Sequence, residues 1–220
     1  MNKKALLAEF VGTFALIFVG VGSIAGNFIN GGQTGLVGIA LAHGLTIAVM
    51  ASATMAISGG QLNPAVTIGL FCAQKIDMAN AIGYIIAQCL GAIAAAFLIK
   101  LCVPHTALIA VGMGTPALGS GISVPAGLLT EIILTFFLVF VIYGTAVDKR
   151  APAAVGGLFI GLAVTVDILI GGPITGAAMN PARHLGPALL GGGLQDTWLY
   201  WLGPVIGGIL AAVCYKNFLE

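Results

Sequence analysis

The chain has 220 residues, of which 59% are hydrophobic and 7% are charged, and its formal net charge at pH 7 is +1. Soluble domains carry about 25% charged residues, so this composition excludes a soluble globular protein and predicts an integral membrane protein. The near-neutral charge and the lack of a basic stripe in the sequence argue against binding to nucleic acid.

The first apolar run follows two lysines and imitates a secretory signal peptide. It is longer than the roughly 7–15 residues of a signal-peptide core, and Glu9 interrupts its start. We therefore expect a first transmembrane helix that is retained in the mature protein.

Six apolar stretches reach the roughly 20 residues that a helix needs to span the hydrocarbon core. In chain order they are about Ala5–Asn27, Gly35–Ser58, Ala79–Val103, Pro125–Ala146, Ala153–Gly171 and Thr197–Tyr215. Two further apolar stretches begin at Asn63 and Asn180 and run for about ten residues each, enough to reach halfway across a bilayer. The prediction is an all-α membrane protein, with six transmembrane helices plus two re-entrant half-helices in a single domain over residues 1–220.

The two halves of the chain resemble each other. Leu7–Gly20 reads LAEFVGTFALIFVG and Leu129–Ile142 reads LTEIILTFFLVFVI, so both contain a Glu followed by Thr-Phe. An Asn-Pro-Ala triplet follows in each half, at Asn63, Pro64 and Ala65 and at Asn180, Pro181 and Ala182. Because each half has three spans, the second half must be inserted upside down. This predicts inverted repeats of about 1–103 and 125–220, with a shared site near the membrane midplane.

Basic residues predict the orientation, because cytoplasmic loops carry an excess of Lys and Arg. With six spans, most of them fall on one side: Lys3, Lys4, Lys75, Lys149, Arg150 and Lys216. Lys100 falls near the other side, and Arg183 lies in the second short segment. We therefore expect a multi-pass protein of the cell membrane with both termini in the cytoplasm.

Each triplet predicts a capped helix start inside the membrane. Asn63 and Asn180 are placed as N-caps, and Pro64 and Pro181 occupy the first helical position, where a missing N–H costs nothing. With its oxygen bound to the helix, each Asn is expected to leave its NH₂ in the pore lumen as a donor. Two helix N-termini add positive dipole ends of about half a charge each, which favour a permeating oxygen atom and repel cations and protons.

The segments GGQLNPAVTIGL and MNPARHLGPAL resemble the two signature loops of the aquaporin, or major intrinsic protein, family. The resemblance covers essentially the whole chain. It implies a homotetramer with one pore per subunit and a function as a passive transmembrane water channel.

The same resemblance implies the residues of a selectivity filter. Arg183 matches the filter arginine, and the flanking motifs place His43, Ile168 and Ala177 at the other filter positions. Strict water channels usually have an aromatic residue where this chain has His43 and a His where it has Ile168. The set found here looks more like that of the plant vacuolar members, so we expect small neutral solutes such as ammonia or urea to pass as well as water.

Glu9 and Glu131 are carboxylates inside predicted spans. One alternative is that they couple protons in an ion-coupled secondary transporter. The resemblance implies instead that they accept hydrogen bonds from the backbone of the re-entrant loops, and we expect this loop-supporting role. A glycerol facilitator of the same family is the nearer alternative. Such members usually carry Asp where this chain has His184, and a Pro where it has Tyr200-Trp201. Asp167 is also unusual, and we expect it near the outer helix end, paired with a donor.

The sequence predicts no cofactor, no metal and no enzymatic activity. The cysteines lack metal-ligand spacing, and no nucleophile–base pair is apparent. The expected partners are water and small neutral solutes, the lipid bilayer, and further copies of the chain.

Overall fold

The computed structural model describes residues 2–151, 153–191 and 193–220. Six helices in it are long and apolar enough to cross a membrane. They are α1 (Lys3–Ile29), α2 (Gly35–Ser58), α4 (Met78–Cys102), α6 (Val124–Ile142), α7 (Gly156–Thr175) and α9 (Thr197–Phe218). The six predicted spans are confirmed. The two largest differences are at helix ends: α7 reaches Thr175 where Gly171 was expected, and α6 ends at Ile142 where Ala146 was expected.

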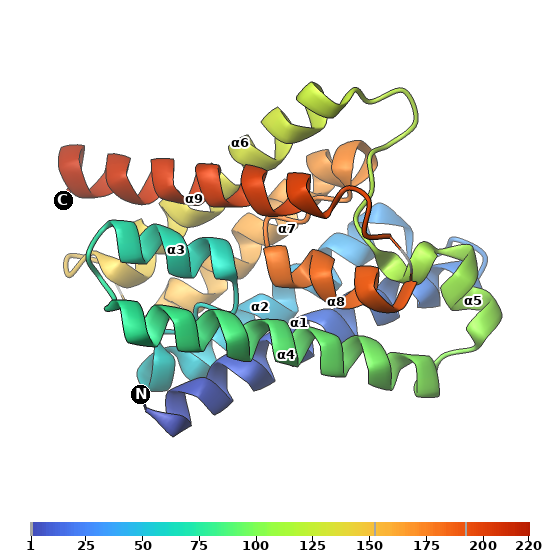
Figure 1. The fold of residues 1–220 in the computed structure, drawn as a ribbon, viewed down its shortest axis with the longest axis horizontal. Coiled ribbons are helices and arrows are strands. Elements are labelled where there is room, and N and C mark those ends of the chain that lie inside the picture. Colours follow the sequence, from blue (N-terminus) through green and yellow to red (C-terminus); the bar gives the residue numbers. More distant parts are fainter. Residues whose placement is uncertain (1, 152, 192) are drawn as a thin grey trace.

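Two short helices lie among the long ones, α3 (Pro64–Cys72) and α8 (Pro181–Gly191). Both start at the proline that follows the capping asparagine. In Figure 1, α3 and α8 lie between the long helices toward opposite ends of the bundle. They are the two predicted half-helices.

Three smaller elements were not expected. A helix α5 (His105–Ala110) and a 3₁₀ turn η1 (Gly112–Gly114) follow α4, and a 3₁₀ turn η3 (Ala153–Val155) precedes α7. Elements of three to six residues carry too little apolar periodicity to be recognised in a sequence. A further turn, η2 (Tyr143–Val147), continues α6 as a π-helix.

Small residues let the long helices pack closely. Gly91 of α4 faces the carbonyl of Phe10 in α1, and Gly207 of α9 faces the carbonyl of Ile132 in α6. A side chain at either glycine would collide with that backbone. The α1–α4 and α6–α9 pairs are therefore built in the same way, and α2 crosses α7 between them.

Both chain termini lie at the same end of the bundle, which we call the terminal end (Figure 1). Lys75, Arg150 and Lys216 are all at this end, where each bonds a residue of the α3–α4 loop or of the last residues of the chain. Lys100 lies at the opposite end of α4, where its ammonium donates to the Leu190 carbonyl.

Candidate functional site

The two half-helices point their N-termini toward each other in the middle of the bundle. Asn63 caps α3, and its Oδ1 accepts from the backbone N–H of Ala65 at 2.9 Å. Asn180 caps α8 in the same way, and its Oδ1 accepts from Ala182 at 3.0 Å and from Arg183 at 3.2 Å. Asn is a favoured N-cap because its side-chain oxygen satisfies backbone donors that have no partner within the helix.

The amide nitrogens of the two asparagines join the loops to each other. Nδ2 of Asn63 donates to the Met179 carbonyl at 2.8 Å, and Nδ2 of Asn180 donates to the Leu62 carbonyl at 2.9 Å. Leu62 and Met179 both have a left-handed backbone, with φ of 53° and 52°. The expectation that each NH₂ lies in the lumen as a donor did not include this link between the loops. An NH₂ group has two hydrogens, and here one of them links the loops while the other remains for the lumen.

Glu9 anchors the first loop from behind. Its two carboxylate oxygens accept from Ser58 Oγ (2.6 Å), Gln61 N (3.0 Å), Leu62 N (2.6 Å) and Gln88 Nε2 (2.8 Å). A carboxylate has about four lone-pair sites, so these four donors fill its capacity.

Glu131 anchors the second loop in the equivalent way. It accepts from Thr175 Oγ1 (2.6 Å), Ala178 N (2.9 Å) and Met179 N (2.8 Å). Both Glu9 and Glu131 are fully buried. Each carboxylate therefore holds the backbone of the loop segment that directly precedes the capping asparagine.

Replacing Glu131 with glutamine is expected to lower the melting temperature of the purified protein. One carboxylate oxygen becomes an NH₂ that cannot accept from the loop, and leaving a buried donor unpaired costs about 1–3 kcal/mol. Thermal unfolding in detergent, followed by fluorescence, would measure the effect. Asp196→Asn is the matched control, because the Asp196 side chain makes no capping hydrogen bond. Equal melting temperatures for Glu131→Gln and the control would contradict this anchoring role.

A single cavity passes both asparagines and continues to the positions expected to form the filter. Its polar lining residues are Gln61, Asn63, Asn180, His43 and Arg183. Ile168 and Ala177 also line it, and most of the remaining wall is aliphatic. The structure thus brings together all four residues expected at the filter, from α2, α7, the loop before α8, and α8.

The hydrogen bonds of His43 and Arg183 determine which groups face the cavity. Nδ1 of His43 lies 2.9 Å from the Ile39 carbonyl, so Nδ1 carries the proton and donates. Nε2 is then an acceptor, and it lies 3.4 Å from Nη2 of Arg183. Gly20 of α1 makes room for this ring, because a Cβ there would stand 2.5 Å from Nε2.

The η1 turn holds the other side of the guanidinium. Nη1 of Arg183 donates to the Gly114 carbonyl at 3.3 Å. Gly114 and the preceding Met113 both have positive φ, 65° and 57°. This contact is not predictable from the sequence. The Gly-Met-Gly triplet signals a turn, but it does not show that the turn reaches an arginine 69 residues away.

Asp167 and His184 lie outside this cavity lining. Asp167 is buried, and its Oδ2 has no hydrogen-bond partner among the described residues, so the expected donor is not found there. His184 stacks on Tyr200, with ring centroids 4.4 Å apart. The Tyr200 hydroxyl in turn donates to the Thr175 carbonyl at 2.9 Å. Through Tyr200, His184 therefore packs against the segment that Glu131 also holds.

A narrow passage through a six-helix membrane bundle, walled by aliphatic side chains and interrupted by amide and guanidinium donors, defines a channel for small polar molecules. Comparison with known proteins agrees. The family "Major intrinsic protein" matches residues 1–215. The chain belongs to this family, and it is a passive membrane channel and not an enzyme.

Similar proteins include "Aquaporin TIP4-4" of Zea mays, which is 44% identical over 97% of this chain and 86% of the relative. "Aquaporin TIP4-1" of Arabidopsis thaliana is 46% identical over 98% of this chain and 86% of the relative. Among solved structures, the aquaglyceroporin from Plasmodium falciparum superposes with a TM-score of 0.86 at 27% identity, covering 100% of this chain and 97% of the other.

Proposed function

We propose that this protein is a water channel that also passes small neutral solutes such as ammonia or urea. The observation that carries the proposal is the continuous cavity that contains Asn63, Asn180 and Arg183. Water entering it meets aliphatic walls and a few donors, so it is guided as a single file without being held tightly. The positive helix ends and the Arg183 cation oppose the entry of cations and protons.

The proposed filter consists of His43, Ile168, Ala177 and Arg183. Two of its residues offer no side-chain hydrogen bond, because Ile168 is aliphatic and Ala177 has only a methyl group. Nδ1 of His43 is engaged by the backbone, which leaves Arg183 as the main side-chain donor. A filter with few polar groups discriminates less between water and other small neutral hydrogen-bonding molecules, which supports passage of ammonia or urea.

The contacts of the buried carboxylates argue against an ion-coupled transporter. A coupling site needs a carboxylate that binds and releases an ion during transport. Glu9 and Glu131 instead accept from the loops that present the two asparagines. A glycerol facilitator is the alternative within the family, and the similarity to the structure of an aquaglyceroporin supports it.

We also propose that residues 1–220 form one channel domain made of inverted repeats, about 1–103 and 125–220. In support, Glu9 and Glu131 make equivalent contacts, and the Asn63 and Asn180 amides bond each other's loop. By the positive-inside rule, the protein lies in the cell membrane with its terminal end on the cytoplasmic side. The assembly proposed is a homotetramer with one pore per subunit.

Stopped-flow measurements on proteoliposomes test the proposal. Shrinkage in an impermeant osmolyte reports water, and swelling or internal pH reports glycerol, urea and ammonia. We expect water, urea and ammonia to move faster than in protein-free liposomes, with glycerol near the protein-free rate. Glycerol as fast as urea would favour the facilitator, and water at the protein-free rate would overturn the proposal.

The double variant His43→Phe plus Ile168→His tests the filter. It introduces an aromatic wall and a second polar side chain, so we expect ammonia and urea permeability to fall toward the protein-free rate while water permeability is retained. Leu210→Phe, on an exposed face of α9, is the control for added aromatic volume. Unchanged ammonia and urea rates in the double variant would contradict the assignment of these two residues.

A further inference from the structure

Toward the terminal end the channel meets another cavity, and we call the residues that border both of them the neck. This second cavity is bordered by the α3–α4 loop, and five residues line both cavities. They are Gly60, Gln61, Val66, Ile142 and Ile160. Three of these five are branched aliphatic residues, so the neck is largely apolar. A narrow apolar constriction conducts water only while it stays wide enough to remain wetted.

One wall of the neck continues directly into the π turn, η2. The residue before the turn is Ile142, and Ala146 and Val147 within the turn line the second cavity. The turn is closed by the Asp148 N–H, which donates to the Tyr143 carbonyl five residues earlier at 2.8 Å. π-helical turns are rare and occur frequently at functional sites. Contacts from outside the helix are therefore expected to stabilise this one.

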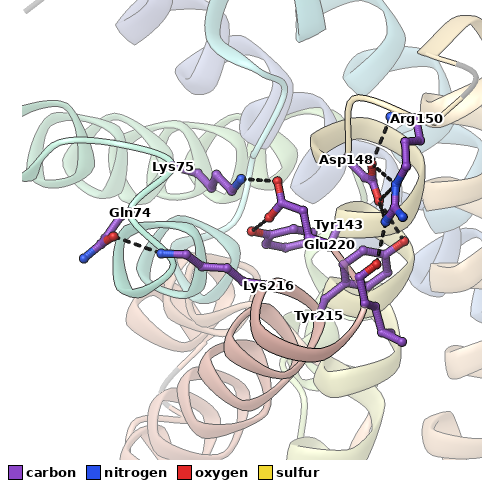
Figure 2. A network of polar contacts seen from close by, with 9 residues as sticks. Gln74, Lys75, Tyr143, Asp148, Arg150, Tyr215, Lys216 and Glu220 are labelled. Carbon is purple, nitrogen blue, oxygen red and sulfur yellow. Dashed lines mark hydrogen bonds and ion pairs between the residues drawn. The ribbon is translucent and has the colours of Figure 1, made fainter.

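The last residues of the chain supply such contacts (Figure 2). The hydroxyl of Tyr143, which is fully buried, donates to Oε2 of Glu220 at 3.0 Å. Its ring stacks on Tyr215 with centroids 4.9 Å apart. The other oxygen of Glu220 accepts from Lys75 Nζ at 2.6 Å. Glu220 thus ties the π turn to Lys75, which itself borders the second cavity.

A second set of contacts joins the far end of the turn to the same segment (Figure 2). The Arg150 guanidinium pairs with Asp148 and also donates to the Leu219 carbonyl. The Tyr215 hydroxyl donates to Asp148 Oδ2 at 3.4 Å. Hydrogen bonds from Lys75 and Tyr143 lower the pKa of Glu220 below its ordinary value of 4.5, so this carboxylate remains charged at neutral pH.

We propose that residues Tyr215–Glu220 form a strap that holds the π turn and so keeps the neck open. This inference rests on the proposed function as a channel. Without the strap, the turn can rewind into ordinary α-helical hydrogen bonding, which shifts the register of the following residues by one. That shift repositions Ala146 and Val147, which continue the cavity wall from Ile142. Any segment or partner that detaches the strap would thereby reduce permeation.

Glu220→Ala tests the strap in proteoliposomes that contain the protein of residues 1–220. We expect osmotic water permeability to fall by about a factor of three or more, equivalent to roughly 0.65 kcal/mol of added barrier. Lys149→Ala is the control, because Lys149 is an exposed charge on the same loop as Arg150 and should leave permeability unchanged. Permeability of Glu220→Ala equal to or above the wild type would overturn the proposal.

Two further measurements separate a role at the neck from general destabilisation. Hydrogen exchange of the backbone over residues 143–148 should be faster in Glu220→Ala than in the wild type. Adding Ile142→Ala to Glu220→Ala should restore most of the lost permeability, because the smaller side chain widens the neck. Unchanged exchange, or a failed rescue, would overturn the proposal. If wild-type liposomes conduct no better than protein-free ones, the proposed function fails, while the exchange experiment still decides whether the strap exists.

Discussion

Arg183→Val is expected to raise glycerol and urea permeability by about tenfold or more, which corresponds to lowering the barrier by about 1.4 kcal/mol. The guanidinium spans the filter between the Gly114 carbonyl and His43 Nε2. Valine removes this bulk together with the positive charge, so larger solutes fit and protons and cations are no longer repelled by Arg183. Proteoliposome swelling and internal-pH measurements would report both changes.

Arg183→Lys is the matched control for charge. Lysine keeps a cation but lacks the planar fork that reaches two partners at once. We therefore expect Arg183→Lys to keep protons out while it admits more glycerol than the wild type. If Arg183→Val passed no more glycerol, urea or protons than the wild type, Arg183 would not control selectivity.

Replacing both Asn63 and Asn180 with alanine is expected to abolish most water conduction and to lower the melting temperature. Each substitution removes an N-cap, which costs about 1 kcal/mol, and it also removes one of the two bonds between the loops. The half-helices are then no longer held end to end, and the middle of the cavity loses its amide donors. Stopped-flow water permeability and thermal unfolding would measure the two effects.

The serine pair, Asn63→Ser plus Asn180→Ser, separates capping from conduction. Serine is an N-cap about as good as asparagine, but its short hydroxyl cannot reach the carbonyl of the opposite loop. We expect it to recover part of the melting temperature without restoring water permeability. Wild-type water permeability in the alanine pair, with the protein folded, would show that the amides do not guide water.

Glu9 shows how much of the site is accessible from sequence alone. Its place in a predicted span, with a matching Glu131 in the second half, left proton coupling and loop support open, and the family resemblance favoured two equivalent loop anchors. The identity of the donors was not accessible. Gln88 reaches Glu9 from another helix, 79 residues along the chain, and no local pattern marks that contact.

For His43, the sequence predicted the position of the side chain but not its tautomer. Alignment of flanking motifs placed it among the filter residues, and it does line the cavity. Its tautomer depends on the carbonyl of Ile39 and on the approach of Arg183 from α8. For Asp167, the expected hydrogen-bond donor is not found in the described part of the chain. A carboxylate on a transmembrane helix suggested a paired donor, whereas its Oδ2 has none among the described residues.

The sequence by itself determined the features that local chemistry controls. Apolar runs long enough to span a bilayer give the six long helices, and Asn-Pro at two places gives two half-helices with their caps. Only the tertiary structure decided which groups remain free for a permeating molecule. One hydrogen of each Asn amide is consumed by a carbonyl more than a hundred residues away. The π turn and its contacts with Glu220 likewise depend on segments that meet only in the folded bundle, so no spacing within either segment could reveal them.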